Sequence, residues 1–134
     1  MRLIKFRGKK YENGKWCFGV PLIMSDGSVY MVDIVRLHGY HTSLLLNNTL
    51  GEFTGQLDIN GTEIYEGDIV KVHDNYDVYG KNAGEIYEVV FADGGFRYKP
   101  KYNGLGFYLE SGKDVVVIGN IYQEKEDKLN DTSN

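Results

Sequence analysis

Acidic side chains are the first candidates for chemistry in the sequence. Glu63, Glu66 and Asp68 form one cluster, and Asp74 and Asp77 form a second. Paired carboxylates can act as acid and base when burial pushes their pKa values apart. The two clusters are predicted in a turn and in an exposed loop, where water keeps the carboxylates ionised. Capping of backbone N–H groups and solubility are therefore the favoured interpretation.

Histidines are the second candidates, as ligands of a metal ion. His38 and His41 are separated by two residues, while Asp33, His73 and Cys17 lie elsewhere in the chain. This spacing matches no zinc pattern that couples a cysteine pair to a histidine pair, so no metal or cofactor is expected. The sequence also lacks a Gly-x-Ser-x-Gly elbow, a phosphate-binding loop and a dinucleotide fingerprint. We expect no enzyme activity and no small-molecule substrate.

Cationic side chains alternate along two predicted strands. One set is Lys5, Arg7 and Lys9; the other is Arg97, Lys99 and Lys101, close to the aromatic residues Phe96, Tyr98 and Tyr102. A strand face of cations beside aromatic rings can bind single-stranded nucleic acid through phosphate contacts and base stacking. The formal net charge of −4 favours an ordinary solvated face instead. The second set is kept as the candidate nucleic-acid face.

Tyrosines offer a third kind of surface. Five of the eleven lie in predicted loops or late strands, namely Tyr76, Tyr79, Tyr102, Tyr108 and Tyr122. Tyrosine is enriched in protein interfaces, but a core tyrosine with its hydroxyl at the surface is an equal alternative. The long polar loop 73–84, which carries two of them, is predicted to be mobile or functional.

Composition bounds the class of protein. A chain of 134 residues with 42% hydrophobic residues suits one domain, or two small subdomains sharing a core. The single Cys17 excludes an internal disulfide and fits a reducing compartment. We find no secretory signal and no segment able to span a bilayer, so a cytoplasmic location and no membrane contact are expected.

The elements that position these side chains are predicted to be strands. Asn-Gly and Asp-Gly turns at 13–14, 26–27, 60–61, 93–94 and 103–104 favour tight hairpins. The predicted strands cover residues 4–7, 15–23, 28–37, 68–73, 85–92, 96–101, 107–109 and 115–122, while 38–50 stays ambiguous between strand and helical turn. Short strands, Gly-rich turns and one long loop predict an all-β protein with a small barrel.

The segment Ile64 to Val70 is the most informative turn. Gly67 is predicted to relieve a Cβ clash where the backbone bends before a strand, and Asp68 to accept backbone N–H groups there. We therefore assign both residues a structural role.

The same segment lies inside a wider pattern. Gly51-Glu52-Phe53-Thr54-Gly55, Asp58, Asn60-Gly61 and Glu63 to Val70 follow in order, preceded by Ile4 to Arg7 and Lys15 to Gly19, and followed by Val117 to Tyr122. This pattern resembles the YopX family of bacteriophage and prophage proteins. The resemblance implies an SH3-like barrel in the second half and a β-rich first part, and it implies no activity and no functional residues.

Together these observations predict an all-β chain with three parts. Residues 1–54 form an N-terminal β-hairpin subdomain packed on the barrel, 55–123 the SH3-like barrel, and 124–134 a disordered acidic tail. The predicted function is a non-catalytic protein-interaction or assembly module from a phage or prophage, able to self-associate, in the cytoplasm of a bacterial host. The alternative is a nucleic-acid-binding accessory module.

Overall fold

A computed structural model describes residues 3–35, 39–73, 84–101, 107–108, 112 and 114–123. Several predictions therefore lie outside the described residues: most of the loop 73–84, the tail 124–134, and the side chains of His38, Asp74, Tyr76, Asp77, Tyr79 and Tyr102. No helix in the described part of the chain is long and apolar enough to cross a membrane.

The described residues form eleven strands and one helical turn at 121–123. The strands are β1 (Phe6–Lys9), β2 (Trp16–Ile23), β3 (Val29–Val35), β4 (Gly39–Leu44), β5 (Gly51–Leu57), β6 (Glu63–Tyr65), β7 (Asp68–Val72), β8 (Ile86–Ala92), β9 (Gly95–Pro100), β10 (Phe107–Tyr108) and β11 (Val115–Asn120). The prediction of an all-β chain is confirmed at this level.

Hairpin turns account for much of this order. Asp93 and Gly94 have φ values of 51° and 82°, as the two central residues of a primed turn require, and they join β8 to β9. The predicted turns at 13–14, 26–27 and 60–61 likewise separate successive strands. The turn predicted at 103–104 lies outside the described residues.

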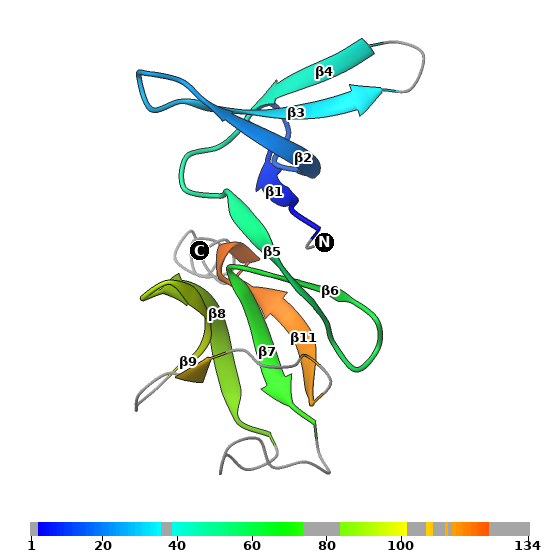
Figure 1. Cartoon of the computed structure of the whole chain (residues 1–134), viewed down its shortest axis with the longest axis vertical. Coiled ribbons are helices and arrows are strands. Elements are labelled where there is room, and N and C mark those ends of the chain that lie inside the picture. Colours follow the sequence, from blue (N-terminus) through cyan, green and yellow to red (C-terminus); the bar gives the residue numbers. More distant parts are fainter. Residues whose placement is uncertain are drawn as a thin grey trace, which may run out of the picture. The chain divides into compact units, whose positions relative to one another are not determined.

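The strands form two antiparallel sheets (Figure 1). Hydrogen bonding follows the order β4-β3-β2-β1-β5-β6 in one sheet and β10-β9-β8-β7-β11 in the other. By compactness the chain divides after Phe53 into two units, so that β5 contributes residues to both. We describe each unit by itself.

The first unit is a curled sheet around a small core. Beyond β4 the chain returns to the end of β1, where Leu45 forms a bridge with Lys10. Leu45 and Met31 are buried on the inner face. A Cβ on Gly8 would lie 2.5 Å from Cδ1 of Leu45, so a glycine at this position lets Leu45 pack directly on β1.

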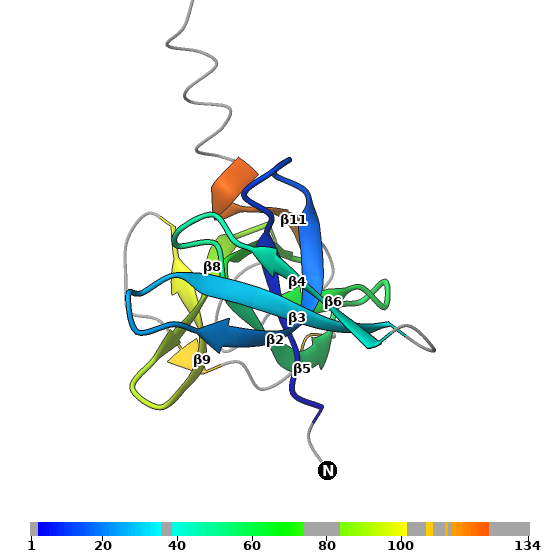
Figure 2. The same cartoon turned by 90° about the horizontal axis from the view of Figure 1, so that it is seen from above.

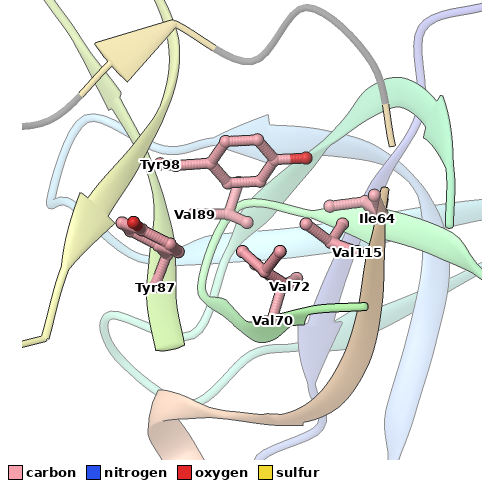
Figure 3. Close-up of a cluster of buried hydrophobic side chains, with 7 residues drawn as sticks. All are labelled: Ile64, Val70, Val72, Tyr87, Val89, Tyr98 and Val115. Atoms are coloured by element: carbon pink, nitrogen blue, oxygen red, sulfur yellow. The ribbon is translucent and has the colours of Figure 1, made fainter. Parts of the chain in front are cut away.

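The second unit has the larger core. Its buried side chains come from β6, β7, β8, β9 and β11 and converge in one cluster (Figure 3): Ile64, Val70, Val72, Tyr87, Val89, Tyr98 and Val115. The rings of Tyr87 and Tyr98 lie 6.0 Å apart at a tilt of 49°. Each fully buried apolar side chain of this kind contributes about 1.5–3 kcal/mol, so the cluster is a major source of stability for the second unit.

The predicted closed barrel is not observed among the described residues. The second sheet is open, with β10 at one edge and β11 at the other. The reason lies at the outer edge of β11, whose backbone is already bonded. Ile59 N donates to Val115 O at 3.1 Å, and Val117 N donates to Oδ2 of Asp58 at 2.9 Å. These contacts of the turn after β5 occupy positions that barrel closure would need.

Candidate interaction surface

An unusual number of apolar side chains on β2 face solvent. Phe18, Val20 and Leu22 alternate along the strand and are 48%, 61% and 50% exposed. Residues that alternate in this way share one face of a sheet. The opposite face of β3 carries Met31, which is buried in the core of the first unit. The exposed side chains therefore lie on the outer side of the sheet.

The two neighbouring strands continue this surface. In the register of the sheet, Leu22 pairs with Tyr30 and Tyr30 with Leu44. These cross-strand neighbours form rows across the three strands. In the next row Val20 pairs with Val32, and the exposed Tyr40 of β4 lies in the row after that. Figure 2 shows β2, β3 and β4 side by side. We call this surface the outer face and define it by Phe18, Val20, Leu22, Tyr30, Val32, Tyr40 and Leu44.

The seven side chains of the outer face carry no charge and are mainly apolar; the register adds the exposed Thr42 beside Val32 and the buried Arg7 beside Phe18. Its five most exposed side chains leave about 400 Å² of apolar surface in water, taking ordinary full areas for these side chains. A contiguous patch of that size is at the scale of the largest patch on a typical monomer, and such patches commonly mark interaction sites. This chemistry suits contact with another apolar surface.

The sequence did not single out this surface. Val20 and Leu22 alternate with Pro21 and Ile23, so that both sides of the strand are apolar and the sequence cannot tell which one is covered. Only the burial of Met31 and Leu45 on the other side identifies the outer face. A run of apolar residues on both faces of a predicted strand was the available signal.

The candidate nucleic-acid face lies on β9. Arg97 and Lys99 share one face of this strand, whereas Tyr98 points into the core on the other. Phe96 packs edge-on against Phe91, with 5.1 Å between ring centres. Phe96 and Tyr98, two of the aromatic residues expected to stack beside the cations, thus lie on the opposite side of the strand.

Acidic groups lie next to these cations. The Arg97 guanidinium is 3.5 Å from the Asp93 carboxylate, and Lys99 pairs in register with Glu88. Lys101 continues the line just beyond the end of β9, where it is half-buried. The electrostatic attraction for phosphate is reduced by both carboxylates.

The other basic set, on β1 and at the residue before it, is not a solvated face. Arg7 and Lys9 are buried, and both lie over the ring of Trp16, at 4.3 Å and 5.3 Å from its centre. Lys5 lies over Phe53 at 5.4 Å. These cation–π contacts give the β1 cations a packing role within the first unit.

Two residues of the first acidic cluster, Glu63 and Asp68, accept hydrogen bonds at the turn before β7. Asp68 is buried, and its Oδ2 accepts the N–H of Tyr65 at 2.8 Å across the turn. Gly67 has a φ of 93° in that turn and donates its N–H to Val89 O. Glu63 accepts the hydroxyl of Tyr65 at 3.2 Å. These contacts of Glu63 and Asp68 hold the turn that leads into β7.

The candidate metal ligands are dispersed. Cys17 donates its thiol to Gly8 O at 3.4 Å, and burial raises the pKa of that thiol. Asp33 and His41 are cross-strand neighbours, and both are exposed. Within the residues that the structure describes, no group of three or more His, Cys, Asp or Glu side chains is placed to hold a metal ion.

The second unit carries a shallow hollow on the outer side of β7 and β11. It has a volume of about 170 Å³ and is lined mainly by Lys71, His73, Val116 and Ile118. Pockets for drug-sized ligands measure about 300–1,000 Å³. The hollow is therefore smaller than a typical ligand site.

Comparison with known proteins places the chain in a family. The family model described as YopX protein matches residues 5–126. The chain belongs to the YopX family. The crystal structure of protein EF1440 from Enterococcus faecalis is similar to it, with a TM-score of 0.54 and 22% sequence identity, over 94% of this chain and 98% of that one. At that identity the similarity shows the fold alone. None of the curated proteins is significantly similar in sequence.

Proposed function

We propose that this member of the YopX family is a non-catalytic binding module that acts by protein–protein contact through its outer face. The exposure of five large apolar side chains on one sheet face is the observation that carries the proposal. Their removal from water offers a free-energy gain of about 10 kcal/mol before the costs of association.

The remaining parts of the proposal concern the origin of the chain and the fold of its second unit. We place the chain among bacteriophage or prophage proteins acting in the bacterial cytoplasm, in keeping with its membership of the YopX family. We also relate the second unit to SH3-like barrels. Four strands follow one another as a meander from β7 to β10, and the fifth, β11, returns beside β7, which is the strand order of an SH3-like barrel left open at its edges.

Affinity purification of matched variants tests the proposal. Val20→Lys places a charge on the outer face, whereas Ile23→Lys places one at an equally exposed site on the other side of the same strand. Tagged chains are expressed in the native host beside an untagged copy, and bound proteins are identified by mass spectrometry. We expect an identified protein to co-purify with the wild type and with Ile23→Lys but not with Val20→Lys. Equal recovery from all three would contradict the proposal.

A further inference from the structure

We propose that the outer face docks onto the outer face of a second copy of this chain, giving a dimer with two-fold symmetry. This inference rests on the proposed function, because it names the partner of the same surface.

Charge is the first argument for a second copy. Each chain has a net charge of −4, so two copies repel each other wherever their charged surfaces meet. None of the seven side chains that define the outer face is charged, so two copies that meet through these side chains bring no like charges of this set together. A strongly acidic or basic partner would find no opposite charge there.

Shape is the second argument. Two sheets pack face to face at about 10 Å when their apolar side chains interdigitate. One end of the outer face carries Phe18 and Tyr40 on its outer strands, and the other end carries Leu22 and Leu44 there, with Tyr30 between them; the row of Val20 separates the two ends. A two-fold axis along this middle row places Phe18 and Tyr40 of one copy on Leu22 and Leu44 of the other. The same patch thus serves on both subunits, as an isologous interface requires.

The available area sets the strength of the dimer. Each copy contributes about 400 Å² from its five most exposed side chains, so two copies bury about 800 Å². The partly exposed Tyr30 and Val32 bring the total to about 1,000 Å², which is the lower limit for a specific interface. We therefore expect a reversible dimer that dissociates in the micromolar range and not a permanent one.

Sedimentation of the purified full-length chain at about 1 to 500 µM tests the inference. The average mass of the wild type is expected to rise from the 15.2 kDa of one chain toward twice that value. Val20→Lys is expected to weaken the dimer at least tenfold, because two like charges would face each other in the interface. Ile23→Lys, its matched control on the opposite side of β2, is expected to leave the dimer unchanged.

Three results would overturn the inference. They are a wild type that keeps the mass of one chain at 500 µM, an equal effect of the two lysine substitutions, and growth beyond the dimer into open assemblies. If Val20→Lys fails to fold, dilution of the wild type followed by NMR replaces it. Shifts confined to β2, β3 and β4 support the dimer, and shifts confined to other strands overturn it.

The outcome also separates this inference from the proposed function. A monomeric chain whose outer face still selects another identified protein in the purification experiment refutes the dimer and leaves the binding module standing. A monomeric chain with no face-dependent partner refutes both.

Discussion

Replacing Asp58 by asparagine tests how the turn after β5 holds the edge of β11. Asp58 is buried, and its Oδ1 accepts the N–H groups of Asn60 and Thr62 at 2.8 Å and 2.9 Å. Its Oδ2 accepts Val117 N–H, 59 residues further along the chain. In Asp58→Asn the amide can keep the two local bonds, but its NH₂ group then meets the N–H of Val117, and two donors cannot bond each other.

The expected loss follows from that geometry. A hydrogen bond to a charged group contributes about 1.5–3 kcal/mol, and leaving its partner unsatisfied adds to the cost. We expect Asp58→Asn to lower the free energy of unfolding by about 2–4 kcal/mol. That is a large part of the 5–15 kcal/mol typical of a folded domain.

Urea unfolding followed by far-UV circular dichroism measures this loss. Asp26→Asn is the matched control, because Asp26 also caps a turn but is exposed, and its bonds to Ser28 are local. We expect the control to keep the midpoint of the wild type. A loss below about 0.5 kcal/mol in Asp58→Asn would refute the role assigned to the bond with Val117.

Three further predictions concern the second unit. Gly67→Ala is expected to lower the free energy of unfolding by about 1–3 kcal/mol in urea, since φ is 93° there; an unchanged midpoint would contradict this. Burial and the nearby Glu85 raise the pKa of Tyr87 above its ordinary value of 10.0, so the folded chain holds this proton more tightly than the unfolded chain. The contribution of Tyr87 to the free energy of unfolding is therefore fully present below pH 10, and above that pH it falls by up to about 1.4 kcal/mol per pH unit. Tyr87→Phe should flatten that slope in alkaline unfolding experiments. Because Lys99 faces Glu88, we expect no oligonucleotide binding by fluorescence anisotropy at low salt; salt-dependent binding that weakens in Lys99→Ala would instead favour the nucleic-acid alternative.

Local turn chemistry made part of the fold predictable. Asn-Gly and Asp-Gly pairs accept positive φ without cost, so the reversals at 13–14, 26–27, 60–61 and 93–94 could be assigned from residue types alone. The strands β4, β5 and β6 were not assigned as strands. β5 pairs with β1, which is distant in the sequence, whereas β4 and β6 are strands because they extend the preceding strands β3 and β5.

Long-range contacts explain what the sequence could not predict. The open edge of the second sheet depends on the bond from Val117 to Asp58, and no local sequence pattern predicts a contact between residues so far apart in the chain. The outer face is a similar case. Val20 and Ile23 are exposed apolar residues on opposite sides of β2, and only the three-dimensional fold shows which side of the strand faces the core of the first unit.

The role proposed for the outer face is contact with another protein. Its most direct test is photo-crosslinking in the native host, with benzoylphenylalanine placed at position 20 in one variant and at position 23 in the other. We predict adducts to an identified protein, a second copy of this chain included, from position 20 and little adduct from position 23. Equal yields from the two positions, or adducts from position 23 alone, would contradict the role proposed for the outer face.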